Sequence, residues 1–228
     1  MEESRLEHKR IKKAQLKEVK RSLISYLLPK SQVSEQYRRI RSAIQFASSK
    51  KAQSRIIAIT SAASKEGKST TAANLAVVFA QQQYKVILID ADMRNPSCHY
   101  QFNVNNEIGL TSVLLGSHDI SEATIVTTIP NLHLLSCGPI PPNPAELLGM
   151  KEMDWLLSEV RKRYDYIFID TPPVLDVTDS QIIAEKSDGV VLVASTKTKI
   201  ESAKRAKNLI VKARGNLLGV VLNRNKAR

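Results

Sequence analysis

The stretch of residues 56–71, IIAITSAASKEGKSTT, constrains the fold of this chain more than any other. Its first four residues are apolar and predict a short buried strand. After a polar loop, Gly67 and Lys68 begin a predicted helix with apolar residues on one face, at Leu75, Val78 and Phe79. A strand, a loop and a helix that meet at Gly-Lys-Ser indicate a phosphate-binding P-loop, in which backbone N–H groups and the helix dipole attract an anion.

This context gives the loop residues separate roles. Gly67 lets the backbone approach a phosphate closely, Lys68 reaches the β- and γ-phosphates, and the Ser69 hydroxyl is a Mg²⁺ ligand. The usual motif begins with a further glycine, and Ala62 stands in its place. A helix cap without phosphate binding is therefore the alternative. The residues expected to bind a nucleotide are Glu66, Gly67, Lys68, Ser69, Thr70 and Asn223.

Two later apolar segments end in aspartates. Residues 86–90 end in Asp90, and Asp92 follows on the same side of an extended chain; residues 166–170 end in Asp170. Like charges this close repel one another unless a cation lies between them. An aspartate at the tip of a buried strand facing a P-loop is the Walker B pattern, so Mg²⁺ and phosphate chemistry is the preferred interpretation. Turn-forming aspartates are the alternative.

Strands and helices alternate along the rest of the chain. Further strands are predicted at 132–135, 190–194 and 217–222, and helices at 109–116, from 145, at 153–160, 179–186 and 199–213. This alternation predicts an α/β fold with a mostly parallel central sheet and helices on both faces. Ligands of such folds bind outside the carboxyl ends of the strands, where the candidate residues are all placed.

Residues 34–46 predict a separate helix with Ser34 as its N-cap. Its apolar stripe is Tyr37, Ile40 and Ile44. Its charged residues recur every three positions, at Glu35, Arg38 and Arg41, and are expected along one other side. They form either an intrahelical ion pair, which contributes little stability, or a stripe that pairs with a neighbouring subunit.

Positive charge is concentrated at the two ends of the 228-residue chain, whose net charge is +12. Residues 1–30 hold nine Lys or Arg against four Glu, and residues 197–228 hold ten against one. Basic segments of this kind bind an anionic membrane surface, an acidic partner or nucleic acid, or they are simply a solvated surface. We expect 1–30 to be a basic, amphipathic and weakly ordered segment and 31–228 to be the P-loop domain.

Composition excludes several other classes. No apolar run approaches the roughly 18 residues of a membrane-spanning helix, and the two cysteines, Cys98 and Cys137, form no metal motif or disulfide framework. A cytoplasmic protein is expected. The basic ends contain a single aromatic residue, Tyr26, so a base-stacking platform and nucleic-acid binding are not expected.

Taken together, these motifs closely resemble those of the bacterial tyrosine kinases of capsule and exopolysaccharide systems, within the MinD-like, deviant Walker class of P-loop NTPases. The resemblance covers residues 31–224. The motifs that carry it are Glu35-x-x-Arg38-x-x-Arg41, Gly67-Lys68-Ser69-Thr70, residues 89–96 (IDADMRNP), residues 136–148 (SCGPIPPNPAELL) and residues 169–173 (IDTPP).

The resemblance implies an autophosphorylating, ATP-dependent protein tyrosine kinase that regulates polysaccharide synthesis. It implies ATP and Mg²⁺ as cofactors and protein tyrosines as substrates. It also implies activation by the cytoplasmic tail of a transmembrane partner, recruitment to the inner face of the membrane, and self-association through Glu35, Arg38 and Arg41. The implied catalytic residues are Lys68, Asp90 and Asp92, and the implied metal ligands are Ser69, Asp90, Asp92 and Asp170. Either Asp90 or Asp92 would orient or deprotonate the tyrosine hydroxyl.

Two departures from related patterns point in different directions. Ala63 occupies the position of the signature lysine of partition ATPases, which disfavours a partition-type ATPase. The last tyrosine is Tyr166, whereas the resemblance implies a C-terminal tyrosine cluster, and this departure keeps a second hypothesis open. The second hypothesis is a nucleotide-dependent assembly regulator or ATPase with little kinase activity. If the chain labels itself, we expect the acceptor to be Tyr26, in the basic segment. The alternative is that Tyr26 packs within an amphipathic helix.

Overall fold

A seven-stranded sheet forms the centre of the structure, a computed structural model that describes residues 23–47 and 55–224. The strands are β1 (Arg55–Ser61), β2 (Val86–Asp90), β3 (Thr124–Val126), β4 (Leu132–Leu135), β5 (Tyr166–Asp170), β6 (Gly189–Ser195) and β7 (Leu217–Asn223). Their order across the sheet is β3-β4-β2-β5-β1-β6-β7, and every pair is parallel except β3 with β4. The predicted mostly parallel sheet is confirmed.

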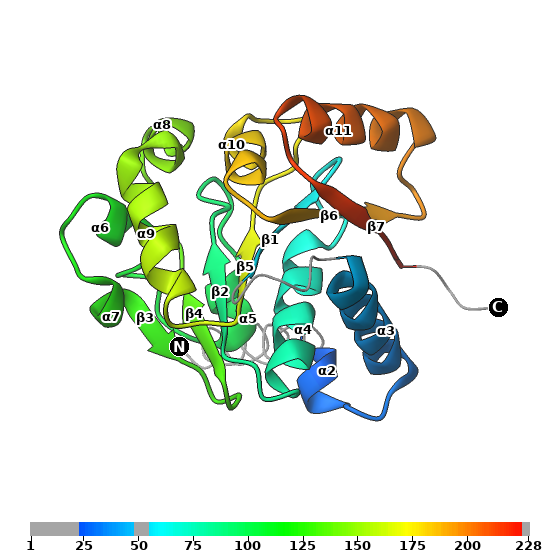
Figure 1. The fold of residues 1–228 in the computed structure, drawn as a ribbon, viewed down its shortest axis with the longest axis horizontal. Coiled ribbons are helices and arrows are strands. Elements are labelled where there is room, and N and C mark those ends of the chain that lie inside the picture. Colours follow the sequence, from blue (N-terminus) through cyan, green and yellow to red (C-terminus); the bar gives the residue numbers. More distant parts are fainter. Residues whose placement is uncertain (1–22, 48–54, 225–228) are drawn as a thin grey trace, which may run out of the picture.

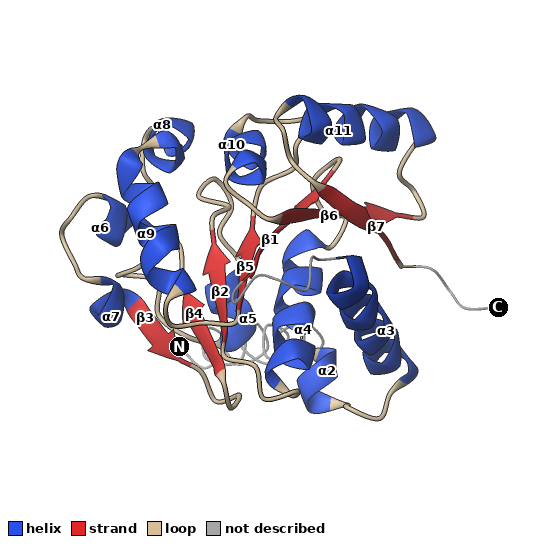
Figure 2. Ribbon diagram, viewed as in Figure 1, coloured by secondary structure: helices blue, strands red, loops and turns tan. Residues whose placement is uncertain are grey.

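Helices cover both faces of this sheet (Figures 1 and 2). One face carries α2 (Ile24–Leu27), α3 (Gln32–Ala47), α4 (Lys68–Ala80) and α5 (Cys98–Phe102). The other carries α6 (Leu110–Leu114), α7 (Ile120–Ala123), α8 (Pro144–Gly149), α9 (Lys151–Arg161), α10 (Asp179–Glu185) and α11 (Ile200–Lys212). None of these helices has the length and apolar character needed to cross a membrane.

The apolar strands divide their side chains between two buried cores. Alternate residues of a strand point to opposite faces, so Ile57 and Ile59 of β1 contact the α4 side, while Ile56 and Ala58 contact the α9 side. Helix α4 is buried along residues 71–80. Its position relative to the sheet is therefore fixed by packing along almost its whole length, and so is the loop that precedes it.

Strand register brings the predicted site residues to one edge of the sheet. Strand β5 lies between β1 and β2, and Asp170 of β5 pairs directly with Asp90 of β2 and with Ile59 of β1. The loop after β1 leads into α4, whose first residue is Lys68. The P-loop lysine and both strand-end aspartates are thus placed together by the sheet itself.

Several short elements were not predicted. Strand β3 has three residues and pairs antiparallel at the sheet edge, and helices α5 and α7 have five and four residues. Segments of this length contain too few residues to show a period of two or of 3.6. Strand β7 was predicted, but several of its residues are exposed because it forms the other edge.

The N-terminal cap of α3 differs from the prediction. The helix begins at Gln32, two residues before Ser34, and the Ser31 hydroxyl accepts a hydrogen bond from the Ser34 N–H at 3.2 Å. Ser31 therefore occupies the capping position. Ser34 is buried within the first turn, and its hydroxyl donates to the Leu28 carbonyl at 2.7 Å.

Arg41 does not lie on the exposed side of α3 as predicted. It is 8% exposed, beside the buried Tyr37 and Ile44, and its Nη1 donates to the Val78 carbonyl of α4 at 2.7 Å. The reason is geometric: residues six apart on an α-helix are separated by about 120° around the axis. Arg41 therefore reaches the buried side. Glu35 and Arg38 stay near the surface and form the intrahelical ion pair, with Nε 2.8 Å from Oε2.

The described part of the N-terminal segment packs against α4. The Ser25 N–H donates to Asn74 Oδ1 at 2.8 Å, and Gln81 Nε2 donates to the Ser25 carbonyl at 3.0 Å. Leu23, the N-cap residue of α2, is buried, whereas Tyr26 within α2 is 40% exposed. Tyr26 therefore belongs to an anchored helix rather than to a weakly ordered segment. Residues 1–22 lie outside the described residues.

The role of Arg41 can be tested by Arg41→Ala. The last carbonyls of a helix have no partner within it, so the variant leaves the Val78 carbonyl unsatisfied in the interior. We expect unfolding free energy to fall by about 2 kcal/mol. Arg38→Ala, which removes an equal charge from a surface pair, should cost roughly 0–1 kcal/mol. Urea denaturation measures both, and equal losses would contradict the structural role of Arg41.

Candidate functional site

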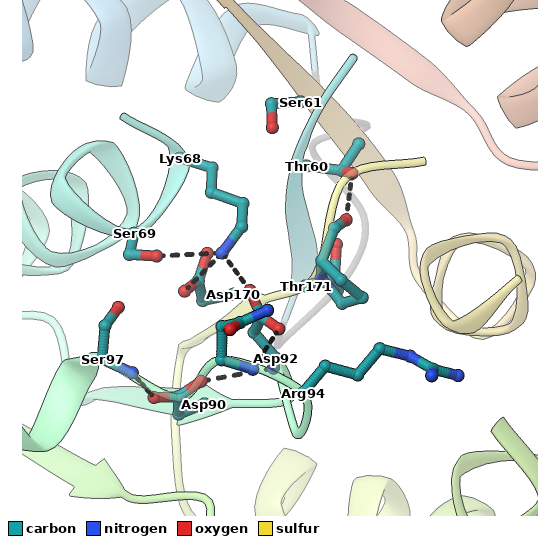
Figure 3. A network of polar contacts seen from close by, with 12 residues as sticks. Thr60, Ser61, Lys68, Ser69, Asp90, Asp92, Arg94, Ser97, Asp170 and Thr171 are labelled. Atoms are coloured by element: carbon teal, nitrogen blue, oxygen red, sulfur yellow. Dashed lines mark hydrogen bonds and ion pairs between the residues drawn. The ribbon is translucent and has the colours of Figure 1, made fainter. Parts of the chain in front are cut away.

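Lys68 is the centre of a buried cluster of charged side chains (Figure 3). Its Nζ lies 2.6 Å from Asp92 Oδ2 and 3.4 Å from Asp170 Oδ2, and it donates to Ser69 Oγ at 3.0 Å. Burial alone would lower the pKa of Lys68, but Asp170 and Asp92 outweigh it and raise that pKa above its ordinary value. Lys68 is therefore a permanent positive charge in this site.

Asp90 is fully buried and organises the loop that follows β2. Its Oδ1 accepts a hydrogen bond from the Asp92 N–H at 3.2 Å, and its Oδ2 accepts two at 2.9 Å from the N–H groups of Ser97 and Cys98. Burial and the nearby Asp170 carboxylate raise the pKa of Asp90 to about 7. Asp90 thus has its hydrogen bonds satisfied while its charge is poorly compensated.

Asp170 shows the clearest need for a further cation. It is fully buried, its pKa is raised above the ordinary value by burial, and its Oδ1 has no hydrogen-bond partner among the described residues. Three carboxylates face a single ammonium group here, which leaves a formal charge of about −2 when all are ionised. Oxygen ligands with excess negative charge are what Mg²⁺ requires, so these residues fit the expected metal.

The P-loop backbone is tight at Gly67. Its φ is +94°, and a β-carbon added there would lie 2.0 Å from Asn223 Nδ2. That same amide donates to the Glu66 carbonyl at 2.9 Å. The end of β7 therefore supports the loop directly, and the predicted residue Asn223 is brought to it. Thr70 lies in the first turn of α4, where its carbonyl accepts a hydrogen bond from Asn74 Nδ2 at 2.8 Å.

The Glu66 side chain faces the loop's own backbone. Its Oε2 accepts hydrogen bonds from the N–H groups of Ala62 at 2.9 Å and Ala63 at 3.1 Å, and its Oε1 accepts one from the Thr198 hydroxyl. The side chain is 5% exposed. Glu66 therefore shapes the loop where the usual first glycine is absent, and its contact with a nucleotide stays a prediction.

Three residues of the site were missed from the sequence. Asp179 is buried and receives a bidentate interaction from Arg94, with Nε and Nη2 at 3.0 and 3.1 Å, which holds the loop after β2. Thr198 supports Glu66 from the loop after β6. The Cys98 thiol lies 3.9 Å from Asp170 Oδ2. Single residues outside any spaced motif give no signal that links them to a site, because only the fold brings them together.

Comparison with known proteins decides the family. The family model described as "AAA domain" matches residues 54–213. Tyrosine-protein kinase YwqD of Bacillus subtilis (strain 168) is 49% identical over 209 residues, which are 91% of this chain and 88% of that protein. The chain belongs to the bacterial tyrosine-protein kinases.

Solved structures agree with this assignment. The kinase domain of the Escherichia coli tyrosine kinase ETK superposes on this kinase with a TM-score of 0.86 at 30% identity, covering 90% of this chain and 81% of that one. The septum site-determining protein MinD of Pyrococcus horikoshii, determined with Mg-ADP, has a TM-score of 0.64 at 25% identity and covers 75% and 70%. The predicted P-loop fold and the resemblance to capsule-type tyrosine kinases are confirmed.

The tight contact at Gly67 predicts the effect of Gly67→Ala. The added methyl group meets the Asn223 amide and strains a positive φ, so we expect affinity for an ATP analogue to fall by about tenfold or more, which corresponds to roughly 1.4 kcal/mol. Gly149→Ala is the matched control, because a β-carbon there meets no atom within 4 Å. Isothermal titration calorimetry measures both. Unchanged affinity in Gly67→Ala would contradict the assigned loop geometry.

Proposed function

We propose that this kinase transfers the γ-phosphate of ATP to protein tyrosines, and that it regulates capsular or exopolysaccharide synthesis with a membrane-embedded activator. The observation that supports the chemistry is the single Lys68 ammonium group among three strand-end carboxylates, next to the N-terminus of α4. The MinD neighbour supports the use of nucleotide with Mg²⁺, since that protein was determined with Mg-ADP.

Lys68 would exchange its partners when the nucleotide binds. Its present partners, Asp92 and Asp170, neutralise it in the absence of phosphate. The P-loop N–H groups and the α4 dipole favour an anion at this position, and the ammonium group would then turn toward the β- and γ-phosphates. There it stabilises charge that develops during transfer.

The residues that would hold Mg²⁺ are Ser69, Asp90 and Asp170. When bound, the ion supplies charge neutralisation of the phosphates. Asp170 Oδ1 is buried without a hydrogen-bond partner among the described residues, so we propose it as a ligand of the ion. Asp90 is already constrained by three backbone N–H groups, so we assign it to supporting the metal rather than to moving a proton.

Asp92 is the carboxylate that we assign to the tyrosine hydroxyl. Its Oδ1 accepts the Asn95 N–H at 3.1 Å, which fixes its orientation, and its Oδ2 lies 2.6 Å from Lys68 Nζ. Departure of Lys68 toward phosphate frees that oxygen. A tyrosine hydroxyl has an ordinary pKa near 10, so a freed carboxylate within hydrogen-bonding reach would orient it and accept its proton.

The partners follow from the family. We propose that the cytoplasmic tail of a transmembrane protein activates the kinase and recruits it to the inner face of the membrane. Self-association would use the surface pair of Glu35 and Arg38. Arg41 is bound to the Val78 carbonyl within the chain, so its participation would require that contact to break. Tyr26 is exposed enough to be modified, but the main substrates are expected on other proteins.

The central test is Lys68→Met. Loss of the ammonium group removes transition-state stabilisation, and we expect tyrosine phosphorylation to fall by about 100- to 1,000-fold. Lys65→Met, at the exposed tip of the same loop, is the control for charge and should keep most of the activity. The assay combines purified protein, labelled ATP, Mg²⁺ and the candidate activator tail, with phosphotyrosine detection and phosphosite mapping.

The aspartate variants separate the two proposed roles in the same assay. Asp90→Asn and Asp170→Asn should raise the Mg²⁺ concentration needed for half-maximal rate, whereas Asp92→Asn should lower the rate even at saturating Mg²⁺. ATP hydrolysis without phosphotyrosine in the native protein would instead favour the assembly regulator or ATPase. Full activity in Lys68→Met would refute the P-loop assignment.

Self-association is tested by replacing Glu35 and Arg38 together with alanine. The pair is on the surface, so stability should change by less than about 1 kcal/mol, while the mass in light scattering with nucleotide and activator should shift toward that of the monomer. Arg39→Ala removes one exposed charge from the same helix and serves as control. An unchanged mass in the double variant would leave only the intrahelical ion pair as their function.

A further inference from the structure

The Cys98 thiol lies inside the carboxylate cluster, although nothing in the proposed kinase chemistry uses it. Its Sγ is 3.9 Å from Asp170 Oδ2, and single ligand atoms of Cys98, Asp90 and Asp170 all lie within 4.8 Å of one another. All three residues are fully buried. Helix α5 brings the thiol there, because the Cys98 N–H is itself fixed on Asp90 Oδ2 at 2.9 Å.

The spacing fits a tetrahedral ion with soft ligands. Zinc binds thiolate sulfur at about 2.3 Å and carboxylate oxygen at about 2.0–2.2 Å, so two such ligands lie roughly 3.6 Å apart. The observed 3.9 Å between Sγ and the Asp170 oxygen is close to this separation. Magnesium, by contrast, binds oxygen ligands in octahedral geometry and gains nothing from sulfur.

A second observation points to a ligand at the same place. Asp170 Oδ1 is buried and accepts no hydrogen bond within the described residues, although such an oxygen is costly to leave unpaired. The cluster also carries excess negative charge, with three aspartates against Lys68. A divalent cation would satisfy both the unpaired oxygen and the charge.

We infer that Cys98, Asp90 and Asp170 form a site for a thiophilic divalent cation of the Zn²⁺ class, which inhibits the kinase by occupying the carboxylates that Mg²⁺ needs. On binding, a metal–sulfur bond forms and the thiol proton leaves to solvent; no electron is transferred. The inhibition rests on the proposed magnesium-dependent function, but the binding of the cation does not.

Cadmium titration of the full chain without nucleotide tests the binding alone. Cadmium is a thiophilic substitute for zinc, and its thiolate complexes absorb in the ultraviolet through sulfur-to-metal charge transfer. We expect the native protein to show this band, saturating at equimolar cadmium. Cys98→Ser and Cys98→Ala should lose it. Cys137→Ser should keep the band, because Cys137 is not one of the three proposed ligands. It is a matched control, since Cys137 is the other cysteine of the chain and is also buried.

Zinc inhibition tests the consequence. Each protein is compared with its own zinc-free rate at fixed Mg²⁺, and Cys98→Ser should need about tenfold more zinc or higher for half-inhibition. Asp170→Asn should lower the affinity of the protein for cadmium, measured from the absorption band, by a similar factor. Absence of the band in the native protein, its persistence in Cys98→Ser, or its loss only in Cys137→Ser would each overturn the inference. A band without kinase activity would instead mark failure of the proposed function alone.

Discussion

Three carboxylates share one buried ammonium group at the carboxyl ends of β2 and β5, and the local structure is arranged around that imbalance. Taking an aspartate out of water is costly unless it is paired or hydrogen-bonded. Asp90 accepts hydrogen bonds from three backbone N–H groups, and Asp92 forms an ion pair with Lys68. Asp170 keeps one oxygen unpaired among the described residues. Hydrogen bonds and the ion pair therefore hold the residues of the site in place, but their negative charge is not balanced without a bound cation.

The core supplies the rigidity that this arrangement needs. Direct pairing of Asp90 with Asp170 across two adjacent parallel strands holds like charges together, and the apolar residues of β2 and β5 are buried on both faces. Because α4 is buried along most of its length, the backbone of Lys68 is held in place by the packing of the helix. Only its side chain can move, so an anion that binds at the P-loop acts on the ammonium group rather than on the fold.

The main features of fold and site were predictable because they depend on long or spaced patterns. Apolar strands that end in aspartate, and a glycine-lysine-serine helix start, locate Lys68, Asp90 and Asp170 without knowledge of the structure. Arg41 was misplaced because a three-residue repeat drifts around a helix, and Ser34 because two nearby serines both fit the cap. The orientation of Glu66 and the approach of Cys98 depend on tertiary contacts between segments that are separate in the sequence.

Lys68 is also positioned to couple the binding of a nucleotide to the binding of a cation. In the structure its contacts with Asp92 and Asp170 reduce the repulsion among the carboxylates. A nucleotide that draws the ammonium group to its phosphates removes that compensation, and the carboxylates then favour a divalent cation more strongly than before. Nucleotide and cation should consequently bind cooperatively, since each relieves the charge that the other leaves unbalanced. Because the Cys98 thiol lies inside this cluster, the same coupling should make the site sensitive to the type of cation that binds.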